Sequence, residues 1–266
     1  MERHIILTLG RSGSNTLVNL LNQHPEILNT GEVLGDWNKV RRLRDRLGLY
    51  RGNTAAYLDA LTRRSLLIRG MNTMRSLGRL TAGRPGEIKR LDRVQSLGFK
   101  EFATLMTEQG MRNWLGGRPD VKVIGLVRND PLARLVSWQV MERTGVVASK
   151  SQKHFGDQAF EIDPTRIEEM LTTIAGENDL LMEMLGELPD ERVRILRYDA
   201  FYRDEATRRQ MLDDVFQFLG VKPWQPEIRM KKIVAVPPAE MIANRQECAE
   251  ALKGSRFEGM LDLNPD

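Results

Sequence analysis

The chain has 266 residues, of which 41% are hydrophobic and 29% charged, and its formal net charge is +4. This size allows one full α/β core and requires no second independent domain. The single cysteine, Cys248, excludes an internal disulfide, and no apolar stretch of signal or membrane length precedes Ile5. We therefore expect one domain over residues 1–266, located in the cytoplasm.

An apolar strand at residues 5–9 runs into a polar turn and then into an amphipathic helix. The turn reads Gly-Arg-Ser-Gly-Ser-Asn-Thr over residues 10–16. Because the first N–H groups of a helix lack intrahelical partners and the helix dipole is positive there, this junction is suited to bind a phosphate or a sulfate. It lacks the Lys-Ser/Thr pair of a Walker A loop, so the usual ligands of a magnesium-bound nucleoside triphosphate are missing.

A basic, leucine-rich segment follows, over about residues 36–95. Between Lys39 and Arg93 the chain has 15 Lys and Arg against 4 Asp and Glu, a net charge of +11 that leaves −7 for the remainder. Leucines at loosely helical intervals predict helices inserted between the first two sheet strands. One interpretation of this charge is a docking surface for an acidic acceptor or an acidic carrier protein. We favour the other interpretation, in which the charges lie on solvated helix faces that also attract the phosphates of a cosubstrate. Nucleic-acid binding is disfavoured, because the arginines are not interleaved with aromatic residues.

The remaining elements complete an α/β pattern. Residues 96–101 predict a short strand ending in charge, and residues 121–127 a continuous apolar strand of the buried parallel type. A helix follows Pro131, and another begins after residues 163–166 with an apolar stripe that belongs to the core. Residues 193–199 predict the next strand, and residues 246–253 the final helix.

Two motifs resemble those of the PAPS-dependent sulfotransferases, where PAPS is 3'-phosphoadenosine-5'-phosphosulfate. The turn is similar to the R-S-G-S form of the family's 5'-phosphosulfate loop, and Arg128, Pro131, Arg134 and Ser137 follow the strand at residues 121–127 as in its 3'-phosphate motif. The resemblance implies a three-layer, P-loop-like α/β fold. It also implies that PAPS is the cosubstrate, that no metal is required, and that two sets of residues bind the nucleotide: Arg11, Ser12, Gly13, Ser14, Asn15 and Thr16 at the 5' end, and Arg128, Arg134 and Ser137 at the 3' end.

Four further positions follow from the same resemblance. Lys100 lies in a G-x-K-E segment and is a candidate sulfuryl contact, although an ion pair with Glu101 explains it equally well. Tyr198 matches a family strand-end motif only loosely, and Lys253, with Arg245 nearby, is where a basic loop closes over the nucleotide in relatives. Glu32 occupies the position of the catalytic base in carbohydrate and bacterial members, whereas cytosolic members use a histidine. The catalytic residues that we predict are Glu32, Arg11 and Lys100.

The three histidines are poorly placed for the base. His4 starts the first strand, His24 ends the first helix, and His154 lies in a polar loop. Cytosolic members stack an aromatic residue of the turn on adenine, but this chain has Thr16 at that position. Trp138 is a candidate for the adenine contact, although no motif supports it.

Two other functions stay open. A P-loop kinase or NTPase would need the missing Lys-Ser/Thr pair, and a non-catalytic nucleotide-binding protein would keep Arg11 and Arg128 without needing Glu32. The acceptor, whether a sugar, a lipid, a carrier-bound intermediate or a small metabolite, and the oligomeric state are not readable from the sequence.

Overall fold

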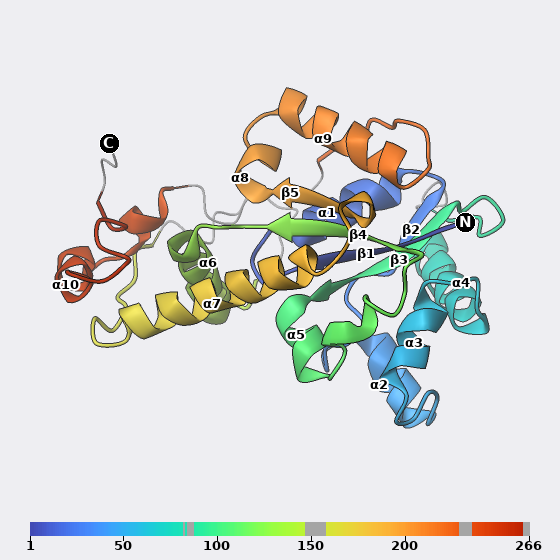
Figure 1. The fold of residues 1–266 in the computed structure, drawn as a ribbon, viewed down its shortest axis with the longest axis horizontal. Coiled ribbons are helices and arrows are strands. Elements are labelled where there is room, and N and C mark those ends of the chain that lie inside the picture. Colours follow the sequence, from blue (N-terminus) through green and yellow to red (C-terminus); the bar gives the residue numbers. More distant parts are fainter. Residues whose placement is uncertain (82, 84–87, 147–157, 229–235, 263–266) are drawn as a thin grey trace. The chain divides into compact units, whose positions relative to one another are not determined.

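Five parallel strands form the central sheet of the computed structural model, in the order β2-β3-β1-β4-β5. In the register of the sheet, Ile5 lies between Phe99 and Val123. The predicted α/β fold, a parallel sheet flanked by helices, is confirmed (Figure 1). The strands are β1 (Glu2–Thr8), β2 (Ile27–Asn29), β3 (Ser96–Phe102), β4 (Val121–Val127) and β5 (Val193–Arg197).

The structure describes residues 1–81, 83, 88–146, 158–228 and 236–262. The chain divides into two compact units. The first comprises Met1–Leu9, Gly13–Val127 and Leu180–Glu227 and holds all five strands, and the second comprises Gly10–Ser12, Arg128–Asp179 and Ile228–Asp266. That residues 1–266 act as one domain stays a prediction.

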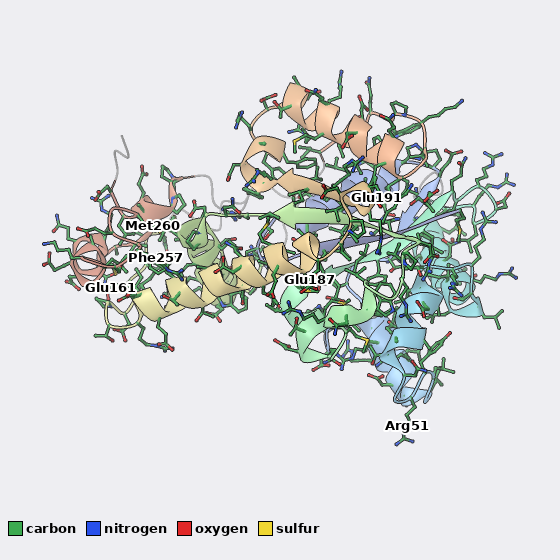
Figure 2. The ribbon with its side chains drawn as sticks, viewed as in Figure 1. Arg51, Glu161, Glu187, Glu191, Phe257 and Met260 are labelled. Carbon is green, nitrogen blue, oxygen red and sulfur yellow. The ribbon has the colours of Figure 1, made fainter. Side chains whose placement is uncertain are left out.

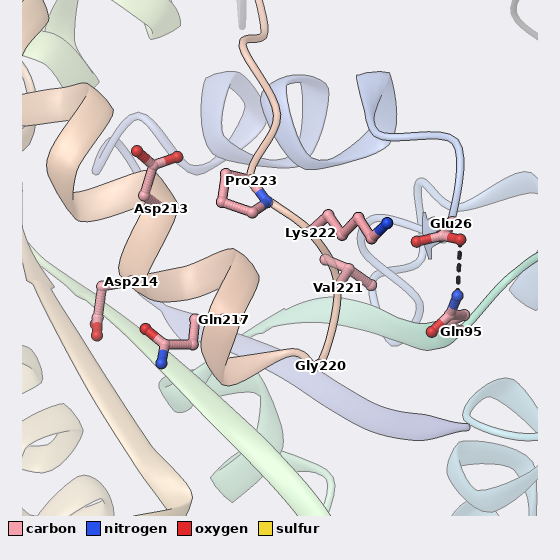
Figure 3. A pocket seen from close by; sticks show the side chains of 9 residues that line it. All are labelled: Glu26, Gln95, Asp213, Asp214, Gln217, Gly220, Val221, Lys222 and Pro223. Carbon is pink, nitrogen blue, oxygen red and sulfur yellow. Dashed lines mark hydrogen bonds between the residues drawn. The ribbon is translucent and has the colours of Figure 1, made fainter.

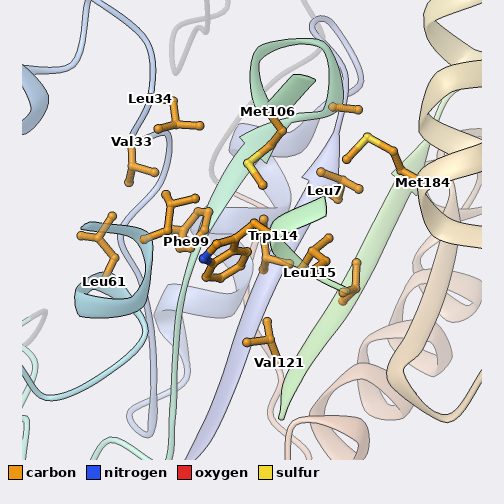
Figure 4. Packing of buried hydrophobic residues seen from close by; sticks show 14 of the residues in the cluster. Leu7, Val33, Leu34, Leu61, Phe99, Met106, Trp114, Leu115, Val121 and Met184 are labelled. Carbon is orange, nitrogen blue, oxygen red and sulfur yellow. The ribbon is translucent and has the colours of Figure 1, made fainter. Parts of the chain in front are cut away.

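The two faces of the sheet bury separate cores in the first unit. Successive side chains of a strand point to opposite faces, so Ile5 and Leu7 join one cluster and Ile6 the other. The first cluster contains Phe99, Trp114 and Met184, among other residues (Figure 4). Helices therefore cover both faces, and the unit has three layers. On the first face are α3 (Thr54–Leu61), α4 (Leu66–Thr81), α5 (Ala103–Glu108) and the end of α7 (Ile167–Gly186), and on the second are α1 (Ser14–Gln23), α8 (Tyr198–Phe201) and α9 (Glu205–Phe218).

The predicted helical insertion lies between β2 and β3. It contains α2 (Lys39–Arg46), α3 and α4, all within residues 36–95. Asn38 begins α2 by accepting hydrogen bonds from the backbone of Val40 and Arg41, and Asn53 accepts one from Ala56 at the start of α3. The sequence did not predict β2, which has only three residues.

Side chains bind the main chain at the end of β2. The amide of Asn29 donates to Oδ1 of Asn22 at 2.8 Å, and Nδ2 of Asn22 returns a bond to the Asn29 carbonyl at 2.9 Å. From α4, Nη2 of Arg75 donates to the carbonyl of Thr30 at 2.6 Å. The segment that follows β2 is therefore held from both α1 and α4.

The second unit packs helices around a separate apolar cluster. Asp130 caps α6 (Pro131–Thr144) by accepting a hydrogen bond from the amide of Ala133 at 2.8 Å, and Pro131 occupies the first turn as predicted. The cluster includes residues of α6, the first half of α7, and the turn η4 (Pro238–Met241) before α10 (Arg245–Ala251). Phe257, which follows α10, belongs to it as well (Figure 2).

The remaining short turns are η2 (Arg112–Trp114) and η3 (Asp190–Arg192) in the first unit. Among the helices that the structure describes, none is both long enough and apolar enough to cross a bilayer.

Candidate functional site

Gly13 is the cap residue directly before α1, and only glycine fits this position without rearrangement of its neighbours. Its φ of 72° lies in the left-handed region, and a Cβ at this position would lie 2.9 Å from Cε2 and Oη of Tyr202 and 3.0 Å from Cε2 of Tyr198. The Tyr202 hydroxyl donates to the Gly13 carbonyl at 2.8 Å. Gly13 provides no side-chain cap to α1, so the N-terminal amides of the helix face no protein carboxylate or hydroxyl from that position.

Lys100 joins this helix start to Glu32. Its side chain is buried, and Nζ donates to Oγ of Ser14 and to Oδ1 of Asn15, each at 3.2 Å. The same Nζ forms an ion pair with the Glu32 carboxylate. Burial lowers the pKa of Lys100, and the neighbouring Glu32 charge opposes that shift. Four of the predicted residues, Ser14, Asn15, Glu32 and Lys100, therefore lie together in the first unit.

Trp37 contacts the other oxygen of Glu32. Its Nε1 donates to Oε2 at 2.5 Å, and the residue is 60% exposed. The ring lies close against Gly35, where a Cβ would come within 2.3 Å of it. One carboxylate oxygen of Glu32 thus has a buried partner and the other an exposed one.

Glu101, the neighbour of Lys100, points to the opposite face of β3 and has a different partner from the one that the sequence suggested. Its buried carboxylate accepts hydrogen bonds from the amides of Val33 at 2.9 Å, Leu34 at 2.7 Å and Phe102 at 3.0 Å. Burial raises the pKa of Glu101, and these amides oppose the shift. The salt bridge of Lys100 is formed with Glu32, and Glu101 fixes the backbone directly after Glu32.

The described histidines are engaged in structural hydrogen bonds. His4 is fully buried between Ser96, at 2.8 Å, and Asn29, at 3.1 Å, and burial lowers its pKa to about 3. His24 contacts the Lys222 carbonyl at 3.0 Å and accepts from the Glu26 amide at 3.1 Å, and burial lowers its pKa. His154 lies outside the described residues.

In the second unit, three of the predicted 3'-phosphate and turn residues share hydrogen bonds. Nε of Arg11 donates to Oγ of Ser137 at 3.0 Å, and Nη1 of Arg128 donates to the Arg11 carbonyl at 2.9 Å. Arg11 has a φ of 63°, which is uncommon for a residue with a side chain. Ser12 is buried, and its Oγ has no hydrogen-bond partner among the described residues.

Arg134, the remaining predicted 3'-phosphate residue, is buried and donates to several groups of the second unit. Its Nε donates to the Gly10 carbonyl at 3.2 Å, Nη1 to Oδ1 of Asn178 at 3.0 Å, and Nη2 forms a 2.5 Å ion pair with Glu177. Burial lowers the pKa of Arg134, and Glu177 opposes the shift. These bonds fix the backbone of the turn at Gly10.

The other predicted residues have fewer contacts with the two groups described above. Lys253 is exposed and forms an ion pair with Glu250 at 2.5 Å, and no hydrogen bond or ion pair joins it to another predicted residue in the described part of the chain. Thr16 donates its amide to the Gly13 carbonyl at 3.0 Å, and Tyr198 packs against Tyr202 with ring centroids 4.6 Å apart. Sequence reasoning missed Tyr202, Glu101 and Trp37. The spacing of Tyr198 and Tyr202, one helical turn, was the available signal for the first.

A depression of about 660 Å³ lies at the amino ends of the strands, away from this site. Gln95, which precedes β3, donates to Glu26, which precedes β2, at 2.7 Å (Figure 3). Open parallel sheets bind ligands at the carboxyl ends of their strands. Because this depression lies at the amino ends, we do not include it in the candidate site. The described residues contain no cluster of three or more metal-ligating side chains.

Comparisons with known proteins complete the description. The model of one family, described as "Sulfotransferase family", matches residues 5–226. No curated protein was found to match the chain.

Several solved structures are similar to it, among them three sulfotransferase structures. A sulfotransferase from Alicyclobacillus acidocaldarius is 17% identical with a TM-score of 0.46, and the match covers 98% of this chain and 96% of that one. The sulfotransferase domain of the Synechococcus PCC 7002 olefin synthase is 15% identical, with a TM-score of 0.42 and coverages of 86% and 79%. The sulfotransferase domain from the curacin biosynthetic pathway is 18% identical, with a TM-score of 0.46 and coverages of 87% and 80%.

Proposed function

This chain belongs to the sulfotransferase family, whose model matches residues 5–226, and from that premise we propose that it transfers a sulfuryl group from PAPS to an acceptor hydroxyl, with an amine as second choice. PAPS supplies the sulfuryl group. The residues of the chain bind and orient the two reactants, stabilise the charge on the in-line oxygens and accept a proton. The proposal includes no metal.

The observation that carries the proposal is the position of the buried Lys100 ammonium. It contacts Ser14 and Asn15 at the start of α1, where helix amides are available to an anion, and it also contacts Glu32. A cation in a buried setting stabilises negative charge more strongly than one in water. We assign Lys100 to the sulfuryl oxygens, and the amides of Ser14 and Asn15, together with Ser12, Gly13, Thr16 and Arg11, to the 5' phosphosulfate.

Glu32 is the proposed base. It would accept the acceptor's proton at Oε2, the oxygen whose partner, Trp37, is exposed and can be displaced. Glu101 accepts hydrogen bonds from the amides of Val33 and Leu34, which directly follow Glu32. The backbone at Glu32 is therefore fixed, and its carboxylate starts from a defined position.

For the 3' phosphate we propose Arg128 and Ser137. Arginine offers two parallel donors to a phosphate, and the hydroxyl of Ser137 already serves as a hydrogen-bond partner of Arg11. Arg134 is assigned to support of the turn through the Gly10 carbonyl. Tyr198 and Lys253 stay predicted nucleotide contacts.

The acceptor stays open among sugars, lipids, carrier-bound intermediates and small metabolites. We propose a reducing, cytoplasmic setting, since Cys248 is a buried free thiol.

Nucleotide binding distinguishes this proposal from a kinase. Adenosine 3',5'-bisphosphate, without magnesium, is expected to stabilise the fold more than AMP or Mg-ATP. A ligand at ~100 times its dissociation constant adds ~2.7 kcal/mol of stability, which a thermal-shift assay detects. An equal or larger shift with Mg-ATP would reject the sulfotransferase proposal.

The base is tested by Glu32→Gln, which keeps the shape of the side chain and removes the proton acceptor. We expect turnover to fall ~100-fold or more with nearly unchanged nucleotide affinity. The assay uses radiolabelled PAPS with a cell extract as acceptor pool, and His154→Ala and His24→Ala serve as controls. Labelling that survives in Glu32→Gln and is lost in a histidine variant would assign the base to that histidine.

A further inference from the structure

Helix α4 has two different sides. Ile68 and Met71 are buried in the first unit, whereas Leu66, Met74, Leu77 and Leu80 are exposed by 85%, 64%, 58% and 54%. At 100° per residue, these four exposed side chains fall within an arc of about 120° on the helix. We call them the α4 stripe. It runs along most of a 16-residue helix and is apolar where a surface helix is normally polar.

Exposed apolar side chains are concentrated in the whole insertion. Of the fourteen large hydrophobic residues that are exposed in the described part of the chain, eight lie within residues 37–80. Besides the α4 stripe they are Trp37, Leu43, Leu47 and Leu49. Exposed apolar groups in such number mark an interaction site more often than chance surface residues do.

The same insertion carries the positive charge of the chain. Residues 39–93 have a net charge of +11, although the whole chain has only +4. No ion pair is found within the described residues for the exposed side chains of Arg42, Arg46, Arg51, Arg63 and Arg69. Arg51 extends away from the ribbon at the turn between α2 and α3 (Figure 2). The partner of this surface must therefore be anionic as well as apolar.

These two properties together favour a lipid surface. A second copy of the chain would bring like charges face to face across a two-fold axis. A folded acidic partner needs a complementary shape, whereas the exposed leucines are spread over α2, the following loop and α4. A fluid bilayer adapts to such a spread, and helices with apolar and arginine-rich surfaces lie at its interface.

We propose that the α2–α4 insertion docks on an anionic membrane surface, with the α4 stripe at the level of the acyl chains and the five exposed arginines named above on the lipid phosphates. The helix lies on the membrane and does not cross it. This proposal is independent of the sulfuryl-transfer proposal.

The test measures sedimentation of the full chain with vesicles. We expect binding to phosphatidylcholine vesicles that contain phosphatidylglycerol, little binding to phosphatidylcholine alone, and weaker binding at ~1 M salt, where the screening length falls to ~3 Å. Binding that is equal for both vesicles, or absent for both, overturns the proposal.

The residues are tested by the triple variant Met74→Gln, Leu77→Gln and Leu80→Gln. Its matched control is Met182→Gln with Ile195→Gln, which replaces exposed apolar residues outside the insertion. The triple variant is expected to lower the partition coefficient at least ~10-fold, and the control to leave it unchanged. Because these side chains are exposed, the unfolding midpoint should stay near wild type, which shows that the variant folds. A triple variant that binds vesicles as well as wild type, or a wild-type dimer that this variant dissociates, overturns the proposal.

Discussion

The start of α1 predicts a difference between two glycine substitutions. Gly13 and Gly31 both have left-handed backbones, with φ of 72° and 78°. A Cβ at Gly13 meets Tyr202 at 2.9 Å, whereas a Cβ at Gly31 meets nothing within 4 Å. Gly13→Ala therefore adds a steric conflict to the backbone strain, and Gly31→Ala is a matched control that has the strain alone.

The expected magnitudes follow from these geometries. A left-handed backbone destabilises alanine by about 1 kcal/mol relative to glycine, which is the whole effect expected for Gly31→Ala. At Gly13, Tyr202 must also move, which breaks its 2.8 Å hydrogen bond to the Gly13 carbonyl, worth about 1 kcal/mol, and disturbs its packing by a similar amount. Gly13→Ala should then lower the free energy of unfolding by about 3 kcal/mol.

Urea unfolding of the two variants and the wild type measures this difference as a change in midpoint at constant slope. Gly13→Ala should also weaken binding of adenosine 3',5'-bisphosphate, because the start of α1 shifts with Tyr202. If the two alanine variants lose the same stability, Tyr202 does not restrict position 13 and the explanation is wrong.

Three further outcomes are expected. Arg128→Ala should lose on the order of 1.5–3 kcal/mol in binding adenosine 3',5'-bisphosphate by calorimetry, with little change for a nucleotide that lacks the 3' phosphate; equal losses would make Arg128 structural. Glu101→Ala leaves buried amides unpaired and should lower the free energy of unfolding by ~3 kcal/mol, whereas Glu101→Gln keeps an acceptor oxygen and should lose less, an order that urea unfolding checks. The pKa of His4 is about 3 in the folded chain and 6.5 in the unfolded chain, so protonation of His4 favours unfolding. The contribution of neutral His4 to stability is therefore complete above pH 6.5 and is lost as the pH falls towards 3. Unfolding midpoints measured from pH 7 to 4 should therefore fall more steeply for wild type than for His4→Gln, and parallel curves would contradict the buried, neutral His4.

Much of the sheet was predictable because its strands are simple apolar runs. Residues 121–127 are continuous and apolar, as buried parallel strands are, and β4 has those bounds. The helices of the insertion were predictable from leucine spacing. Strand β2 was not, since three residues carry no measurable alternation. The division into two compact units was also hidden, because the second unit is assembled from three segments far apart in the sequence.

At the candidate site, the sequence predicted which residues take part better than it predicted which residues they contact. The resemblance gave Lys100 and Glu32, but their ion pair joins residues 68 positions apart, and nothing local selects Glu32 over the adjacent Glu101. Strand alternation decides between them, because neighbours on β3 point to opposite faces. The contact of Tyr202 with Gly13 spans 189 positions and depends on how α8 packs, which no local pattern records.

The hydrogen bonds at the end of β2 have a consequence for how the chain behaves at high concentration. A strand at the border of a sheet normally offers unpaired amides and carbonyls to any extended segment that approaches, which is a route to aggregation. Here Asn22 occupies both main-chain groups of Asn29, and Arg75 occupies the carbonyl of Thr30 with a charged side chain. An incoming strand would have to break these bonds and desolvate a guanidinium, so the carboxyl end of β2 is protected against strand addition.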